Sequence, residues 1–379
     1  MSHISLINKV TKTKKTINID WKDGKKSKFH FLWLRDNCPY GVHPTARQRT
    51  FNFLKVSEKI YPIKYSIKKN KLEIVWSENK HKSHYDFNWL RKNCYTIKNK
   101  QKYKSPYILW DKKLKNNLNK VSLNFNDVLS KEKSLTKWLE LLNIYGFSII
   151  RNAPTKKNSA LKLLKLISHV RETFFGTPFE VINIPNPNNT AYTADGLRNH
   201  TDLPYYEYVP GYQFLHCLIN QAEGGYSLAV DGFRVANYLK KNEPKIFKTL
   251  VNTYVKFKDN DYTQKTVRIF HSPLINLNKD QDFNDIRFSI ATMAAMDCNA
   301  NKMEKFYLAY KKFGALLHHD KFTIKFKLKA GDIFCFNNRR ILHGRTEFNP
   351  NSGHRHLQGY YLDRDDLLGR LNYLKKIEV

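Results

Sequence analysis

The sequence predicts an α+β protein: a double-stranded β-helix (jelly roll) with flanking helices, preceded by a small β-rich domain. Strand-like segments are spread along the chain, whereas helical patterns occupy three stretches in its second part, as expected for a sheet fold with helices gathered at one side. A connection rich in lysine and asparagine, residues 98–120, separates the two parts. We therefore expect a β-rich domain over residues 1–105 and a jelly-roll domain over residues 120–379, which a chain of 379 residues can accommodate.

The first part reads as short strands joined by turns. Residues 29–35 and 72–76 are rich in aromatic and β-branched side chains and alternate partly between apolar and polar positions. That pattern favours strands. Both segments are therefore predicted as strands of the small domain.

Three stretches of the second part carry apolar residues at steps of three and four: residues 134–142, 158–174 and 302–317. This spacing predicts amphipathic helices. We interpret the aromatic stripe of the third helix as a packing surface for the core rather than as a cofactor site. The stripe consists of Met303, Phe306, Tyr307, Tyr310 and Phe313.

Strands are predicted between and after these helices, at residues 213–218, 255–257 and 323–336. In the last segment apolar residues alternate with polar ones, so one face of the strand is expected to be buried and the other wet. Residues 330–332 (Ala-Gly-Asp) are expected to turn the chain into a second strand at 333–336.

Composition restricts the cellular setting. No run of about 18 apolar residues is present, so we expect no transmembrane helix, and the polar N-terminus does not resemble a signal peptide. Five cysteines are scattered without regular spacing, which fits a reducing cytoplasm better than a disulfide framework.

The formal net charge of +33 raises a rival hypothesis, that of a basic nucleic-acid-binding protein. The excess is mostly lysine spread over the whole length, and its densest runs lie outside the residues discussed next. We interpret the charge as a biased solvated surface whose field steers anionic small molecules inward.

A metal site is predicted from three residues. His200 and Asp202 are two residues apart, so on an extended strand both side chains point to the same face. His343, 141 residues after Asp202, supplies a third ligand from a distant strand. Two histidines and one carboxylate leave three positions open on Fe(II), which suits binding of a chelating co-substrate and O₂.

Two further residues complete this constellation. Arg355 lies twelve residues after His343, on a predicted strand at 355–361, and its guanidinium can hold the distal carboxylate of 2-oxoglutarate through two parallel hydrogen bonds. Ser227, 27 residues after His200, is expected to add a hydroxyl to the same co-substrate.

At this point the chain resembles the taurine-dioxygenase-like (TauD/TfdA) oxygenases, and within them the branch of γ-butyrobetaine and trimethyllysine dioxygenases. The resemblance covers nearly the whole chain. It rests on segments 33–38 (Trp-Leu-Arg-Asp-Asn-Cys), 200–202, 224–225, 230–233 and 342–345. It implies a homodimer with Fe(II), 2-oxoglutarate as co-substrate and ascorbate as reductant, in which substrate hydroxylation is coupled to decarboxylation of 2-oxoglutarate to succinate.

The resemblance also implies an aromatic cage for a trimethylammonium group. Such a cation has no hydrogen to donate, so ring faces hold it by cation–π attraction. The cage positions fall on Phe175, Phe179, Tyr192 and Tyr361.

At the other end of the substrate, Asn189 matches an asparagine that hydrogen-bonds the butyrobetaine carboxylate. A second asparagine is expected near Ala291, but the chain has no amide there. Either Ser289 or Thr292 compensates, or the substrate has a different anionic end.

Members of this branch often bind structural zinc in the N-terminal domain. Here Cys38, His43 and His81 match ligand positions, and Tyr40 replaces a cysteine. A tetrahedral site needs four ligands, so we expect this zinc to be lost.

The sequence therefore predicts hydroxylation of a small quaternary ammonium compound, with γ-butyrobetaine to carnitine as the first choice. Trimethyllysine or a trimethylammonium phosphonate is the alternative within the branch. A degenerate, non-catalytic member of the fold is disfavoured because every iron and co-substrate position is present.

Overall fold

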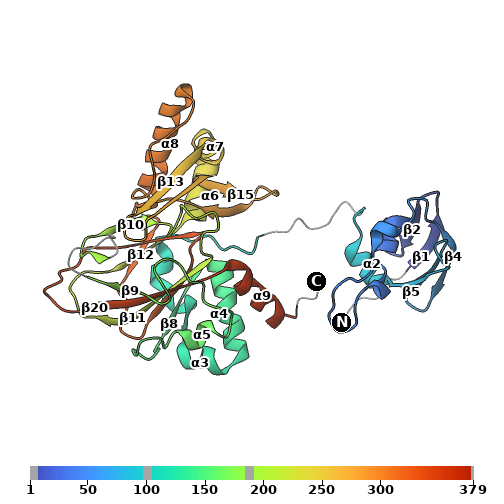
Figure 1. Cartoon of the computed structure of the whole chain (residues 1–379), viewed down its shortest axis with the longest axis horizontal. Coiled ribbons are helices and arrows are strands. Elements are labelled where there is room, and N and C mark those ends of the chain that lie inside the picture. Colours follow the sequence, from blue (N-terminus) through green and yellow to red (C-terminus); the bar gives the residue numbers. More distant parts are fainter. Residues whose placement is uncertain (1–6, 97–104, 184–191, 377–379) are drawn as a thin grey trace. The chain divides into compact units, whose positions relative to one another are not determined.

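A computed structural model of the chain describes residues 7–96, 105–183 and 192–376. The chain divides into two compact units, Met1–Lys104 and Ser105–Val379, and Figure 1 shows their elements. No helix in the described ranges is both long and apolar enough to cross a membrane.

The first unit contains two three-stranded antiparallel sheets, each followed by a short helix. One sheet consists of β1 (Ile7–Lys12), β2 (Thr16–Trp21) and β3 (Lys26–His30), followed by α1 (Phe31–Asp36). The other consists of β4 (Pro62–Lys68), β5 (Lys71–Trp76) and β6 (Lys82–Asp86), followed by α2 (Phe87–Asn93). Two short 3-10 helices, η1 (Pro39–Gly41) and η2 (Phe53–Lys55), lie in the segment between the sheets. One apolar core unites the unit.

The prediction of a strand over residues 29–35 was wrong from residue 31 onward. β3 ends at His30 and α1 begins at Phe31. Phe31 and Leu34, one helical turn apart, are both buried, and buried Arg35 forms an ion pair with Glu78 at 2.7 Å. Packing on one helical face therefore outweighs the β propensity of the aromatic residues. The strand predicted at 72–76 is confirmed as β5.

The second unit is built on two facing sheets, and its jelly-roll prediction is confirmed. The larger has the order β7 (Ser122–Asn124), β8 (Phe147–Arg151), β18 (Ile333–Asn337), β11 (Tyr212–Asn220), β20 (Arg355–Leu362), β9 (Phe179–Ile182). The smaller has the order β10 (Leu197–His200), β19 (Ile341–Arg345), β12 (Ser227–Asp231), β17 (Thr323–Phe326). Apolar side chains from both sheets form a single cluster, including Phe147, Cys217, Ala229, Ile324 and Phe334.

Helices cover the sheets in two groups (Figure 1). A second apolar cluster joins the larger sheet to α3 (Phe125–Ser130), α4 (Glu132–Tyr145), α5 (Leu161–Leu164) and α9 (Arg364–Leu374). A third cluster contains α6 (Gly232–Asn242), α7 (Pro244–Asn252), α8 (Ala300–Leu317) and two hairpins. The hairpins are β13 (Tyr254–Asp261) with β14 (Thr266–Pro273), and β15 (Ile275–Leu277) with β16 (Phe283–Ile286).

The helix predicted over 158–174 was wrong. Only α5, four residues long, forms there. Asn158 takes a left-handed conformation, with φ of 65°, and the backbone N–H of Arg171 donates to the carbonyl of Tyr361 at 2.8 Å. The chain after α5 thus runs against β20 instead of continuing as a helix. The helices predicted at 134–142 and 302–317 are confirmed as parts of α4 and α8.

The second unit begins earlier than residue 120. Trp110 is buried, and its indole N–H donates to the carbonyl of Tyr145 at 2.7 Å. The backbone N–H of Trp110 donates to Asp231 at 3.2 Å. The described part of the lysine-rich connection, residues 105–120, therefore belongs to the second unit. Its later residues form η3 (Lys112–Val121).

Candidate active site

Strand pairing brings the two histidines together. β10 and β19 are antiparallel, and His200 lies opposite His343 in their register, so the ring centroids are 4.4 Å apart. Asp202 lies two residues after the end of β10. Its Oδ1 lies 3.0 Å from Nε2 of His200 and 3.6 Å from Nε2 of His343.

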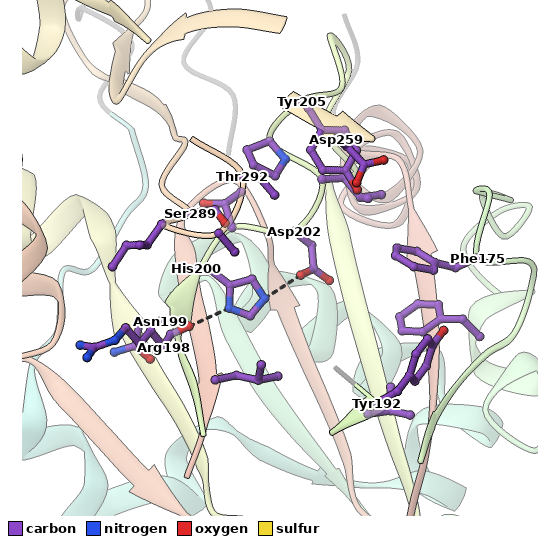
Figure 2. Close-up of a pocket in the computed structure, with 18 of the residues that line it drawn as sticks. Phe175, Tyr192, Arg198, Asn199, His200, Asp202, Tyr205, Asp259, Ser289 and Thr292 are labelled. Carbon is purple, nitrogen blue, oxygen red and sulfur yellow. Dashed lines mark hydrogen bonds and ion pairs between the residues drawn. The ribbon is translucent and has the colours of Figure 1, made fainter. Parts of the chain in front are cut away.

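These three residues form a candidate metal centre. One ligand atom from each lies within 4.8 Å of the others, and no other such group of His, Cys, Asp and Glu was found in the described part of the chain. Figure 2 shows His200 and Asp202 pointing into one pocket.

Neighbouring groups orient the ligands. Nδ1 of His200 lies 2.8 Å from the carbonyl of Arg198, so this nitrogen donates and Nε2 is left facing Asp202. The Tyr361 hydroxyl donates to Oδ2 of Asp202 at 2.7 Å. The Asn338 amide brackets the Asp202 backbone, accepting from its N–H at 2.9 Å and donating to its carbonyl at 3.1 Å. Outer contacts of this kind fix ligand geometry in metal sites.

The electrostatics of His343 and Asp202 suit a divalent cation, whereas at His200 the opposing effect of burial is outweighed by Asp202, so that the pKa of His200 is raised. Burial lowers the pKa of His343 to about 3, against the opposing effect of Asp202. Burial alone would raise the pKa of Asp202, but His343, His200 and Tyr361 hold it below its ordinary value. A neutral imidazole and an ionised carboxylate are the forms that bind metal, so the donor set fits Fe(II).

A small inner cavity of about 80 Å³ adjoins the metal centre. It is lined by His200, Asp202 and His343 together with Ser227 and Arg355. Burial lowers the pKa of Arg355 to about 10, so its guanidinium remains charged at neutral pH. Its buried Nε has no hydrogen-bond partner among the described residues. A cation held in this way fits one end of a dicarboxylate.

A larger pocket of about 510 Å³ also adjoins this centre and is lined by His200 and Asp202. All four predicted cage residues line it: Phe175, Phe179, Tyr192 and Tyr361. The rings of Phe179 and Tyr361 stack with centroids 5.0 Å apart, and those of Phe175 and Phe179 are 6.0 Å apart. Asn189 lies outside the described residues.

Several pocket residues were not predicted. Tyr205 and Asp259 line the larger pocket, and burial raises the pKa of both above its ordinary value. Gln213 and Arg345 line the inner cavity. Arg345 belongs to the recognised segment 342–345, which was a signal for its importance, whereas Asp259 lies in a hairpin without any motif.

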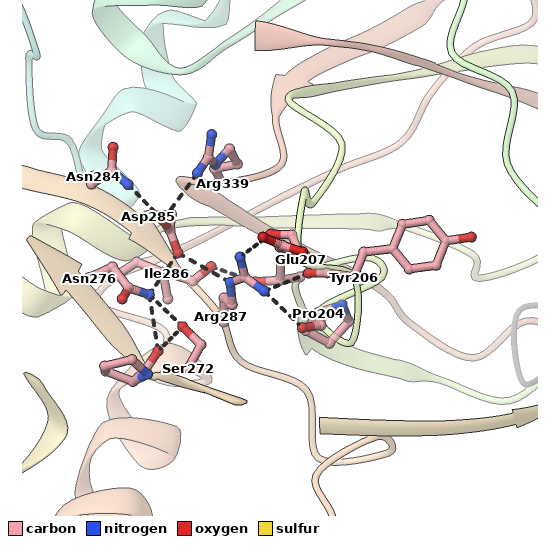
Figure 3. A network of polar contacts seen from close by, with 12 residues as sticks. Pro204, Tyr206, Glu207, Ser272, Asn276, Asn284, Asp285, Ile286, Arg287 and Arg339 are labelled. Carbon is pink, nitrogen blue, oxygen red and sulfur yellow. Dashed lines mark hydrogen bonds and ion pairs between the residues drawn. The ribbon is translucent and has the colours of Figure 1, made fainter. Parts of the chain in front are cut away.

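Figure 3 shows how the segment after Asp202 is held. Leu203 takes a left-handed conformation with φ of 55°, which turns the chain away from β10. The buried Arg287 guanidinium then donates to three backbone carbonyls, those of Pro204, Tyr206 and Glu207, at 3.2, 2.7 and 2.8 Å. It also lies 3.5 Å from Asp285. No sequence pattern described above indicated this role of Arg287.

The three zinc candidates of the first unit differ in their surroundings. Sγ of Cys38 lies 3.2 Å from Nε2 of His81. Nδ1 of His43 instead accepts from the backbone N–H groups of Thr45 and Ala46 at 3.3 and 3.1 Å. The hydroxyl of Tyr40 lies 2.9 Å from Nδ1 of His84.

Comparison with known proteins gives this site its class. Residues 110–361 match the family described as taurine catabolism dioxygenase TauD, TfdA family, and residues 8–91 match the family described as gamma-butyrobetaine hydroxylase-like, N-terminal. The protein is an Fe(II)- and 2-oxoglutarate-dependent dioxygenase. The chain belongs to the TauD/TfdA family and carries the N-terminal domain of its γ-butyrobetaine hydroxylase-like members.

Individual relatives agree with this assignment. The chain is 35% identical to gamma-butyrobetaine dioxygenase of Pseudomonas sp. (strain AK-1), over 95% of this chain and 94% of that protein. It is 28% identical to trimethyllysine dioxygenase of Meyerozyma guilliermondii, over 94% and 93%. A solved structure of a putative alpha-ketoglutarate-dependent taurine dioxygenase from Burkholderia xenovorans shares the fold, with a TM-score of 0.52 and 12% identity, over 68% of this chain and 90% of that chain.

Proposed function

We propose that this protein hydroxylates γ-butyrobetaine to carnitine. The observation that carries the proposal is the larger pocket, which four aromatic side chains line together with the candidate iron ligands His200 and Asp202. Ring faces suit a trimethylammonium group, each contributing about 0.5–2 kcal/mol. The relationship to a gamma-butyrobetaine dioxygenase supports the same substrate.

Each residue has a definite part in this proposal. His200, Asp202 and His343 would hold Fe(II), which when bound supplies the O₂ chemistry of the reaction. Arg355 would hold the distal carboxylate of 2-oxoglutarate, with Ser227 nearby. Phe175, Phe179, Tyr192 and Tyr361 would form the cation cage. Asn189 remains proposed for the carboxylate end.

A related substrate is the second candidate, because the segment 289–292 offers Ser289 and Thr292 but no amide to the pocket. Trimethyllysine or a trimethylammonium phosphonate would present a different anionic end there.

The test is succinate production by purified protein with Fe(II), ascorbate and 2-oxoglutarate, against a panel of compounds. The panel contains γ-butyrobetaine, trimethyllysine, glycine betaine and trimethylaminoethylphosphonate, with taurine as an outgroup. We expect γ-butyrobetaine to give the strongest stimulation. Greater stimulation by another quaternary compound would identify that compound as the substrate instead of γ-butyrobetaine. Stimulation by none of them would contradict the proposed cation cage.

Variants of the metal centre supply the control. Asp202→Ala and His343→Ala should fold normally and lose succinate production, because each removes one of three ligands. Wild-type turnover by either folded variant would contradict the assignment of the iron site.

We also propose that the protein acts in the cytoplasm as a homodimer, with small-molecule partners and neither nucleic acid nor membrane among them. The scattered cysteines support the compartment, and the family resemblance supports the dimer. Light scattering coupled to gel filtration tests the oligomeric state.

A further inference from the structure

The larger pocket has a cation at the end opposite its aromatic side chains. Arg198, on β10, lines the pocket together with Ser289 and Thr292. In Figure 2, Arg198 lies to one side of His200, whereas Phe175 and Tyr192 lie to the other side, beyond Asp202. The candidate iron ligands therefore lie between a cationic end and an aromatic end.

The guanidinium of Arg198 is not used to hold the fold. Across residues 7–96, 105–183 and 192–376 it forms no ion pair or side-chain hydrogen bond. Asp195 lines the same pocket and does not pair with it. By contrast, the guanidinium of neighbouring Arg345 does hold the backbone, because it donates to the carbonyls of Thr193 and Asp195 at 2.7 Å.

The backbone of Arg198 is nevertheless tied to the metal centre, because its carbonyl lies 2.8 Å from Nδ1 of His200. That contact keeps the base of the side chain at a constant place relative to the iron ligand. In the same pocket, the buried hydroxyl of Thr292 has no hydrogen-bond partner in the described part of the chain, and Ser289 is also buried. The pocket thus offers a positive charge at Arg198 and hydroxyl groups at Ser289 and Thr292.

We propose that Arg198 binds the anionic end of the substrate and thereby determines its specificity, an inference that rests on the proposed function. A zwitterion with its trimethylammonium group among the rings and its carboxylate at Arg198 would lie across His200 and Asp202. Its middle carbons would then face the metal. The guanidinium of Arg198 would bind the substrate carboxylate in place of the second asparagine, which the chain does not have near Ala291.

The same charge discriminates between related substrates. γ-Butyrobetaine ends in a bare carboxylate, whereas trimethyllysine carries an ammonium group beside its carboxylate. Arg198 attracts the first end and repels the ammonium of the second. The proposal therefore favours γ-butyrobetaine over trimethyllysine.

The experiment compares γ-butyrobetaine with its primary amide, which keeps the cation and the chain length but has no negative charge. Arg198→Met should raise KM for the acid about tenfold, the loss expected for one hydrogen-bonded charge contact, with kcat changed less than about twofold. KM for the amide and for 2-oxoglutarate should stay within about twofold of wild type. Arg198→Lys should be intermediate, and Lys248→Met, which removes an exposed charge on α7, should behave as wild type.

An equal change for acid and amide, or no change for either, would overturn the role of Arg198 even if wild type converts γ-butyrobetaine. Failure of the wild type to convert any quaternary compound would instead overturn the proposed function and this inference with it. Thermal melting of each variant identifies one that is merely unfolded.

Discussion

A single tyrosine links the two halves of the active site. The ring of Tyr361 stacks on Phe179 in the proposed cage, and its hydroxyl donates to Oδ2 of Asp202. Burial and the neighbouring carboxylate raise the pKa of Tyr361 well above its ordinary value, so the hydroxyl keeps its proton. In the proposed site, one side chain would therefore offer a ring face to the substrate and a hydrogen bond to a candidate metal ligand.

Replacing Tyr361 by Phe separates these two roles. The variant keeps the ring but removes the bond to Asp202, and loss of such an outer contact lowers metal affinity or activity by about 10- to 100-fold. We expect weaker Fe(II) binding in an iron titration, with KM for γ-butyrobetaine nearly unchanged. Tyr360→Phe is the matched control, because the Tyr360 hydroxyl donates to Gln358 on the other face of β20. Equal iron affinity in both variants would contradict this division of roles.

At the scale of single residues, the candidate metal ligands and the proposed cage could be predicted from the sequence because both depend on residue types that chemistry restricts. The sequence did not indicate Asn338 and Asp259, since an amide that brackets a backbone and a carboxylate in a hairpin have no local signature. Tyr361 was predicted for the cage, but its bond to Asp202 depends on the pairing of distant strands.

Among the elements, the β13–β14 hairpin supports the wall of the cage. Arg268 on β14 pairs with Asp259 at 3.1 Å, and its guanidinium lies 4.1 Å from the centre of the Phe174 ring. The ring of Phe174 in turn packs against that of Phe175, with centroids 4.0 Å apart. The side chain of Gln264, in the hairpin turn, donates to the carbonyl of Phe174 at 2.9 Å.

Arg268→Met should loosen this wall. The variant loses the cation over Phe174 and leaves Asp259 without its partner. We expect KM for the quaternary ammonium substrate to rise about two- to fivefold, which corresponds to the loss of one weak cation–π contact. KM for 2-oxoglutarate should not change. Lys265→Met, in the exposed turn of the same hairpin, is the control, and identical kinetics for the two variants would argue against a supporting role.

Element prediction succeeded where periodicity and burial agree, as in α4, α8 and β20. It failed at residues 158–174 because only α5 forms there. The backbone N–H of Arg171 instead donates to the carbonyl of Tyr361 on β20, and the chain then continues to Phe174 and Phe175. The predicted metal site required the segments of His200 and His343 to lie close together, but nothing local specifies a β10–β19 register that pairs residues 143 positions apart.

For the molecule as a whole, a buried histidine makes stability depend on pH. His216 lies fully buried in β11, and burial lowers its pKa to about 4. An unfolded histidine titrates near about 6.5. The unfolded chain therefore takes up a proton that the native protein does not as the pH falls from 6.5 towards 4, so the contribution of the neutral imidazole is complete above 6.5 and is lost below it.

We expect this histidine to cost about 2 kcal/mol of stability at a pH of about 5. Urea unfolding of wild type and His216→Leu at neutral and acidic pH measures the effect, and the wild type should lose more stability than the variant. Parallel losses in the two proteins would show that other groups control the acid response.

Four of the five cysteines are buried, namely Cys38, Cys94, Cys217 and Cys335, and only Cys298 is partly exposed. Burial also raises the pKa of Cys217 to about 12, so this thiol is neither accessible nor ionised. A maleimide applied to the native protein would accordingly react at one position. Because Cys298 follows the pocket-lining segment 289–292 and precedes α8, a fluorophore attached there would report on the arrival of substrate in real time.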